Sequence, residues 1–221
     1  MLINCVAYQN GRKLADIEVP EISDYLAKPD CLVWVALKDP EAGELEVMKE
    51  EFGLHELAVE DVYHGHQHPK IEEYGDSLFA VLHTIEMDEE DQLLIGEVDV
   101  FVGSNYVLSV RNRTRLGFQE VRTRCERQPN LLKEGSGFVL YALIDSIVDR
   151  YFPILQALSA KLEDIEDRIF EKHSIAASRA IIEDLYSLKR RLVALHHHIA
   201  PLLESVGLSP APRDPGFPLG R

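Results

Sequence analysis

The pattern of hydrophobic and polar positions changes once along the chain, near residue 136. Before that point, short apolar runs alternate with turn residues and short amphipathic stretches, a pattern typical of a mixed α/β domain. Beyond it, apolar residues recur at steps of three and four, which indicates long helices. We therefore predict an α/β domain over residues 1–135 and a helical part over residues 136–207.

Several short segments of the first part have the composition of β-strands: residues 2–8, 12–19, 31–37, 78–86, 94–102 and 106–111. The first two flank Asn10-Gly11, a dipeptide that favours a two-residue hairpin turn. Residues 31–37 form a continuous apolar run, which is typical of a strand buried on both faces. In residues 94–102 apolar and acidic positions alternate, so Val98, Val100 and Val102 are expected on one face of the sheet.

Helices are predicted between these strands. Asp39-Pro40 begins the first, because Asp can cap free N–H groups and Pro fits the first helical position. This helix extends to about Glu51, and Gly53 lets the chain turn. A second helix is predicted over residues 55–63 and a third over residues 116–127. Together the strands and helices predict an α/β/α sandwich around a mixed sheet.

Two apolar seams define the helical part. One comprises Ile144, Ile147, Tyr151, Ile154, Leu158, Leu162, Ile165 and Ile169; the other comprises Ile181, Leu185, Leu188, Leu192, Leu195, Ile199, Leu202 and Val206. A short link at residues 171–174, capped by Ser174, predicts that the two helices pack as an antiparallel hairpin. A hairpin of this length is longer than the α/β domain requires, so we expect it to contact another surface as well. Residues 208–221 are rich in Pro and predicted to be disordered.

The composition narrows the function classes. A net charge of −15 disfavours nucleic acid as a partner. Acidity indicates either solubility alone or carboxylates that concentrate cations, and net charge does not separate the two. No apolar stretch approaches the roughly 20 residues that cross a bilayer, and three scattered Cys residues agree with a reducing compartment. We expect this chain by itself to be soluble and cytoplasmic.

No catalytic motif is present, so we predict that the protein is not an enzyme. His64, His66 and His68 alternate in a polar loop, where extended backbone would let them share a Zn²⁺ ion. A polar surface loop is the favoured interpretation of this segment. Residues 196–198 are also all His, but adjacent positions on a helix point about 100° apart and cannot share one ion. We expect them on a solvated or subunit-contacting face.

Acidic residues are the stronger candidates for binding a metal ion. Glu60 and Asp61 end a short predicted helix that is otherwise largely apolar. Asp145 and Asp149 lie one turn apart on one face of the first long helix. Oxygen ligands without nearby Cys favour Mg²⁺ or Ca²⁺ over softer metals.

Asp145 lies in an apolar stretch, where an unpaired buried charge would be costly. It therefore needs a partner. An internal ion pair with Arg150 or Arg190, a helix N-terminus and a bound cation are all compatible with the sequence.

Taken together, several segments resemble the cytosolic domain of CorA-type magnesium transporters. They are residues 52–61, 68–74, 78–82, 140–153, 188–192 and 199–202, and the resemblance extends over residues 31–206 in the family's order. It implies a homopentamer at the inner membrane, in which Mg²⁺ ions bound between subunits hold the pore closed. Asp61 matches the principal inter-subunit ligand and Glu60 its acidic neighbour; Asp145 matches a second-site ligand, and Asp149 an acidic position without an assigned role.

The resemblance has a limit, because the stalk helix, the membrane helices and the Gly-Met-Asn signature of the family are missing from this sequence. The chain would then hold at most half of each regulatory site and no pore, and would meet the membrane only through the missing C-terminal part. Two alternatives stay open. One is a relative with the same fold that transports Zn²⁺, and the other is a soluble, stand-alone assembly protein. The regulatory ion could also be Co²⁺, Ni²⁺ or Zn²⁺ in place of Mg²⁺.

Overall fold

The computed structural model describes residues 1–65, 67–170 and 175–207. His66, the predicted link at residues 171–174 with its cap Ser174, and the Pro-rich residues 208–221 lie outside the described residues. The predicted disorder of the last segment therefore stays a prediction.

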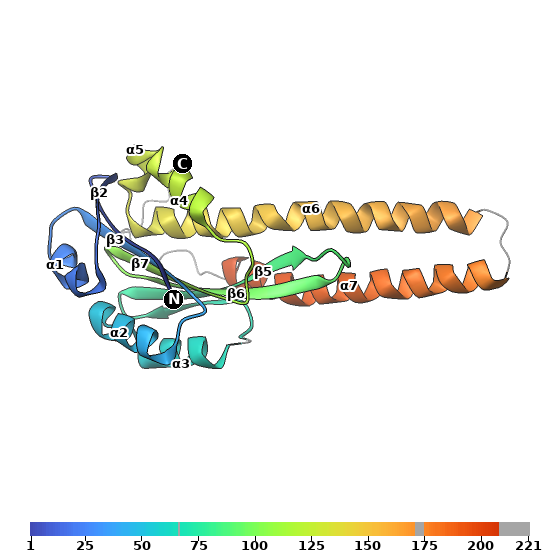
Figure 1. Cartoon of the computed structure of the whole chain (residues 1–221), viewed down its shortest axis with the longest axis horizontal. Helices are drawn as coiled ribbons and strands as arrows, with labels where there is room; N and C mark the ends of the chain where they lie inside the picture. The colour runs from blue at the N-terminus through green and yellow to red at the C-terminus, as the bar shows by residue number, and fades with distance from the viewer. Residues whose placement is uncertain (66, 171–174, 208–221) are drawn as a thin grey trace.

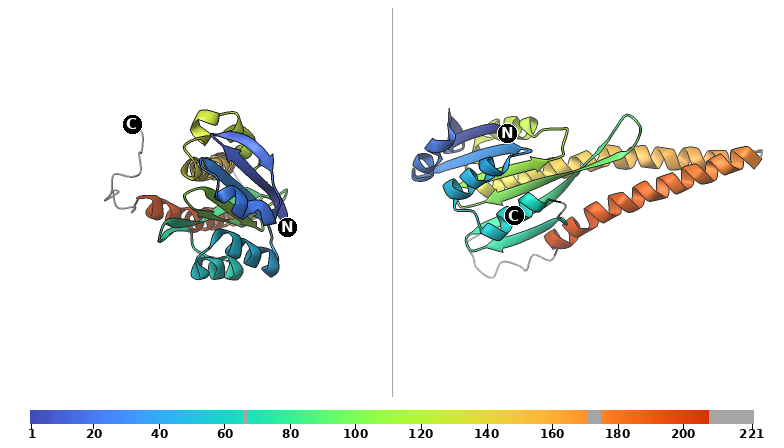
Figure 2. Two further views of the ribbon diagram at one scale, coloured as in Figure 1. Left: turned by 90° about the vertical axis from the view of Figure 1, so that its left-hand side faces the viewer. Right: turned by 60° about the horizontal axis from the view of Figure 1, so that its bottom comes forward.

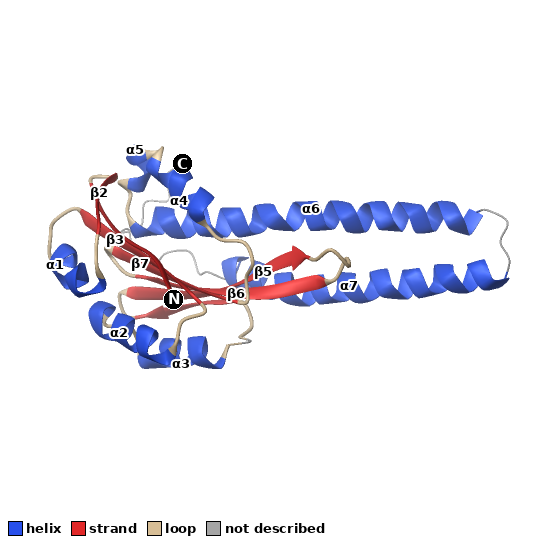
Figure 3. Cartoon of the chain, in the orientation of Figure 1, coloured by secondary structure: helices blue, strands red, loops and turns tan. Residues whose placement is uncertain are grey.

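A seven-stranded sheet forms the centre of the molecule, with the strand order β2-β1-β3-β7-β6-β5-β4. Strands β3 and β7 pair in parallel and all other neighbours pair antiparallel, so the sheet is mixed, as predicted (Figure 3). The strands are β1 Leu2–Gln9, β2 Arg12–Asp16, β3 Cys31–Lys38, β4 Lys70–Tyr74, β5 Ser77–Met87, β6 Leu93–Val102 and β7 Tyr106–Asn112.

Helices cover both faces of the sheet, and the predicted α/β/α sandwich is confirmed (Figures 1 and 2). One face is covered by α1 (Ile22–Leu26), which follows a short 3-10 turn η1 (Val19–Glu21), and by α2 (Ala42–Phe52) and α3 (Glu56–His64). The other is covered by α4 (Gln119–Glu126), α5 (Pro129–Leu132) and α6 (Ser136–Phe170). Helix α7 (Ile175–Gly207) returns beside α6 and reaches β4 and β5.

Strand β6 shows how the sequence pattern divides the core into two. Val98, Val100 and Val102 face the helix α6 side, whereas Phe101 belongs to the core under α2 and α3. This is the predicted alternation, because successive side chains of a strand point to opposite faces. Glu97 and Asp99 share the face of Phe101, so two acidic side chains enter the interior there.

The long helices pack as an antiparallel hairpin that extends beyond the sheet (Figure 1). On α7 the buried positions are seven residues apart: Ile181, Leu188, Leu195 and Leu202. The intervening Leu185 and Leu192 are 43% and 42% exposed. The predicted seam on α7 is therefore not buried along its whole length within the chain, although Ile199 packs against the core. No helix in the described part of the chain contains a stretch apolar and long enough to cross a membrane. The division into domains stays a prediction, since sheet and hairpin residues share one core.

Some predicted boundaries are wrong. Helix α2 begins after Glu41, whose side chain forms a reciprocal capping box with Glu44, because Asp39 instead accepts the backbone N–H of Arg113 at 2.9 Å. The second strand ends at Asp16, since η1 follows at Val19. The helix predicted over residues 116–127 begins only at Gln119. The edge strand β4 was not predicted. Its polar and apolar residues are mostly half-buried and do not alternate clearly between buried and exposed positions.

Candidate metal centre

Helix α3 positions the first pair of candidate ligands. It begins after His55, ends at Gly65 with a positive φ of 59°, and buries Ala58, Val59 and Val62 against the sheet. Glu60 and Asp61 follow one another and therefore point about 100° apart. The Glu60 side chain is 58% exposed and that of Asp61 only 23%, so Asp61 lies at the boundary between helix and sheet.

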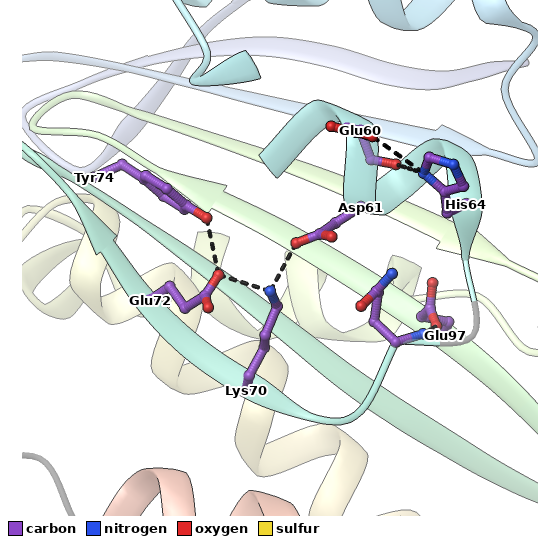
Figure 4. A network of polar contacts seen from close by, with 8 residues as sticks. Glu60, Asp61, His64, Lys70, Glu72, Tyr74 and Glu97 are labelled. Carbon is purple, nitrogen blue, oxygen red and sulfur yellow. Dashed lines mark hydrogen bonds and ion pairs between the residues drawn. The ribbon is translucent and has the colours of Figure 1, made fainter. Parts of the chain in front are cut away.

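Asp61 belongs to a polar network with strand β4 (Figure 4). The Nζ atom of Lys70 lies 2.7 Å from Asp61 Oδ2 and 2.7 Å from Glu72 Oε2, and the Tyr74 hydroxyl donates to Glu72 at 2.9 Å. Partial burial lowers the pKa of Lys70, but its bonds to the two carboxylates raise it more, so the net shift is upward. Lys70 is thus a fixed cation that a metal ion must displace or accommodate at Asp61.

Two further carboxylates lie buried close to this network, on strand β6. Glu97 is 1% exposed and Asp99 is fully buried. Glu97 accepts the backbone N–H of Gln67 at 3.1 Å, and Asp99 Oδ2 accepts a long hydrogen bond of 3.4 Å from Asn112. Asp99 Oδ1 has no hydrogen-bond partner within the described residues.

Asp99 interacts electrostatically with both Glu97 and Asp61. Burial raises the pKa of Asp99 well above its ordinary value, and the negative charges of Glu97 and Asp61 raise it further. Neither Glu97 nor Asp99 is among the metal ligands predicted from the sequence. The signal was available, however, because two acids alternate with Val residues in a strand whose other positions are all apolar.

Replacing Asp99 with Asn is expected to stabilise the protein by about 1–2 kcal/mol at neutral pH. Because the pKa of Asp99 is higher in the folded than in the unfolded state, protonated Asp99 stabilises the folded protein. This contribution is fully present below the unfolded pKa and is lost as the pH rises through the folded pKa. The gain of the variant should therefore shrink toward acidic pH. Chemical denaturation at several pH values measures it, with Asp76→Asn in an exposed turn as the control. Destabilisation by Asp99→Asn at neutral pH would mean that the carboxylate is favourably bonded.

Asp145 lies on the opposite face of the sheet, on α6, and its partner is Arg124 of α4. Arg124 Nη2 lies 2.9 Å from Asp145 Oδ2 and also donates to the carbonyl of Ala142 at 3.2 Å. The predicted partners Arg150 and Arg190 are therefore wrong. The Asp145 side chain is 35% exposed rather than buried, so the ion pair relieves only a modest desolvation cost. Asp149, one turn on, is exposed.

The four predicted ligands do not converge within one chain. Glu60 and Asp61 are on the α3 side of the sheet, and Asp145 and Asp149 are on the α6 side (Figure 1). Among the described residues, no three His, Cys, Asp or Glu side chains are arranged to hold a metal ion. A site that uses both pairs must therefore draw on more than one chain.

Among the described histidines that the sequence singled out, His64, His68, His196 and His197 are exposed as expected, and His198 is not. His64 Nδ1 contacts the carbonyl oxygen of Glu60 at 2.9 Å, whereas the ring of His68 packs edge-on against His197 at 5.4 Å between centroids. His66 lies outside the described residues, so a Zn²⁺ site shared by the loop stays a hypothesis. His198 was expected on a solvated or subunit-contacting face. It instead points to the sheet, where its Nδ1 lies 3.0 Å from Nδ1 of the buried His83 on β5.

Comparisons with known proteins agree with this architecture. The family model described as "CorA-like Mg2+ transporter protein" matches residues 30–215. The chain is 29% identical over 186 residues to the putative metal ion transporter YfjQ of Bacillus subtilis, covering 84% of this chain and 54% of that protein. It is 31% identical over 157 residues to the cobalt/magnesium transport protein CorA of Thermotoga maritima, covering 70% and 44% respectively.

A solved structure shares the fold. The soluble domain of CorA from Methanocaldococcus jannaschii superimposes with a TM-score of 0.66 at 19% identity, covering 96% of this chain and 82% of that one. The chain spans about half the length of the two curated relatives.

Proposed function

Because the chain belongs to the family of CorA-like Mg²⁺ transporter proteins, we propose that it is the cytosolic, metal-sensing part of a divalent-cation transporter. A transporter family is not enzymatic, in line with the absence of a catalytic motif. In this proposal Mg²⁺ ions bind between neighbouring copies of the chain in a homopentamer at the inner membrane. Bound Mg²⁺ holds the copies together and the pore closed; its loss frees them.

The observation that carries the proposal is the separation of Asp61 from Asp145 by the sheet. Each carboxylate already has a cationic partner of its own, Lys70 or Arg124, and both are partly exposed. Two surfaces that each present a carboxylate can complete a site only when chains meet. Glu60 adds a second, more exposed carboxylate beside Asp61, while Asp149 adds one beside Asp145.

The donor set fits a hard cation. Mg²⁺ is held in proteins by one or two carboxylates and retains several waters, so exposed carboxylates at a contact between chains suit it. Neither candidate pair includes a Cys or His that would favour a softer metal, although Co²⁺ and Ni²⁺ tolerate the same oxygen ligands. The carboxylates Glu60, Asp61, Asp145 and Asp149 would hold the Mg²⁺ ions, while Lys70 and Arg124 would be partly displaced.

The proposed ligands are tested by their effect on Mg²⁺-dependent thermal stability of the 221-residue chain. Ligands that bind only the folded state raise the melting temperature by mass action. We expect Asp61→Asn combined with Asp145→Asn to abolish the part of the Mg²⁺ response that exceeds NaCl of equal ionic strength. The matched control is Glu89→Gln with Glu90→Gln, which changes the net charge equally in an exposed turn. An unchanged Mg²⁺ response in the double Asn variant would contradict the assignment.

A Zn²⁺-transporting relative of the same fold is the alternative that the histidine contacts favour. Comparing Mg²⁺ and Zn²⁺ flux in cells that express the gene decides between the two transported ions. A stand-alone assembly role is the outcome if no transport of either ion accompanies expression.

A further inference from the structure

Four histidines from three separate segments form a chain of ring contacts beside the end of α7. His68 of the loop packs on His197, His197 on His198, and His198 on His83, with centroids 5.4, 5.4 and 4.8 Å apart. His83 comes from the middle of β5 and is 6% exposed. The sequence places these residues up to 130 positions apart (198 − 68 = 130), so only the fold brings them together.

The hydrogen bonds of His83 determine which ring nitrogens carry protons. His83 Nε2 lies 2.9 Å from the carbonyl oxygen of Gln67, which can only accept, so Nε2 must donate. Neutral His83 then has a bare lone pair on Nδ1. That lone pair faces Nδ1 of His198 at 3.0 Å, and the one proton between the two atoms belongs to His198.

This is the arrangement in which imidazoles bind metals. A metal-ligating His typically donates its other ring N–H to a carbonyl or carboxylate, which fixes the ring and its tautomer. His83 does so through Gln67. Burial and the neighbouring histidines lower the pKa of both His83 and His198, so protons compete little for these nitrogens at neutral pH.

We propose that His83 and His198 form the core of a binding site for a borderline transition-metal dication, of which Zn²⁺ is the type. The ion replaces the shared proton: His198 moves its hydrogen from Nδ1 to Nε2, both Nδ1 lone pairs bind the metal, and no net proton is released. With Zn–N bonds of about 2.0–2.1 Å in tetrahedral geometry, the two nitrogens sit about 3.3 Å apart. The observed 3.0 Å needs only a small opening.

The site is completed by a third imidazole and water. No three such side chains within the described residues already have ligand geometry, so His68 or His197 must rotate inward. Both are exposed and lie in the same chain of contacts. A bound ion would fasten α7, the second arm of the hairpin, to strand β5. This proposal does not rest on the proposed Mg²⁺ sites, which use carboxylates on other elements.

Calorimetric titration of the tag-free 221-residue chain with ZnCl₂ tests the site, and the visible ligand-field bands of Co²⁺ report tetrahedral nitrogen ligation. One ion per chain should bind, and a MgCl₂ titration should show no competition. His83→Gln and His198→Gln should each weaken Zn²⁺ binding at least about tenfold, since even outer partners of metal ligands contribute that much. His196→Gln, on the same helix but in an exposed apolar groove, and His64→Gln should bind as the parent does.

Folding is monitored by melting curves recorded with a chelator present. If buried His83→Gln impairs folding, the more exposed His198→Gln carries the test. His68→Gln and His197→Gln identify the third ligand as the variant with the weaker Zn²⁺ binding. The proposal is overturned if the parent binds Zn²⁺ no better than Mg²⁺, if His198→Gln binds like the parent, or if His64→Gln alone abolishes binding and so assigns the ion to the loop.

Discussion

Replacing Ile147 with Ala is expected to lower the free energy of unfolding by about 3–4 kcal/mol, within the range for truncating a buried Ile. Ile147 is fully buried in the core that joins α6 to the sheet and to α7. Its loss leaves a cavity at the point where the hairpin is anchored, between Asp145 and Asp149. Urea denaturation followed by circular dichroism measures the change.

The neighbouring Val148→Ala is the matched control for Ile147→Ala. Val148 is 37% exposed on the same helix turn, and its truncation should cost less than about 0.5 kcal/mol. Equal effects of the two substitutions would mean that α6 does not pack on the sheet through the face assigned here.

Lowering the pH from 6.5 to about 4 is expected to remove about 3 kcal/mol of stability through His83 alone. Burial lowers the pKa of His83 to about 4, assisted by repulsion from His198 and His68, although bonding to Gln67 opposes the shift. Because the pKa of His83 is lower in the folded than in the unfolded state, neutral His83 stabilises the folded protein. This contribution is present above the unfolded pKa of 6.5 and is lost as the pH falls through about 4. Protonation also turns His83 Nδ1 from an acceptor into a donor that faces His198.

The effect of His83 is isolated as a difference between two proteins. His83→Gln keeps a side-chain donor for the Gln67 carbonyl but does not titrate, so its stability should fall less than that of the parent across this pH range. Carboxylates titrate in both proteins and cancel in the comparison. His64→Gln, at an exposed position, should follow the parent. Parallel curves for His83→Gln and the parent would show that His83 titrates normally.

The layers of the fold were predictable because the turn residues and the apolar positions of the sequence are also the turns and the buried positions of the structure. Asn10-Gly11 predicted the hairpin of β1 and β2, and Gly53 ends α2 with a positive φ of 61°. The alternation in β6 predicted that Val98, Val100 and Val102 share one face, and in the structure that face meets α6. Edge strand β4 escaped prediction because it pairs only with β5 and shows no clear alternation of buried and exposed residues.

The candidate site was only partly predictable, since its contacts join residues distant in sequence. The family resemblance singled out Asp61 and Asp145, but their partners Lys70 and Arg124 follow from the packing of β4 and α4. The pairing of His83 with His198 has no local signal, because periodicity shows which face a residue occupies and not which residue it meets. Register across the sheet and the position of α7 decide that contact.

Self-association of the chain in Mg²⁺ tests the central claim most directly. Sedimentation velocity compares the parent with the Asp61→Asn/Asp145→Asn variant, each in MgCl₂ and in NaCl of equal ionic strength. Mg²⁺ should raise the sedimentation coefficient of the parent in a concentration-dependent way and leave that of the variant at its NaCl value. Equal sedimentation of parent and variant in Mg²⁺ would contradict the proposal that these carboxylates hold neighbouring copies together through the ion.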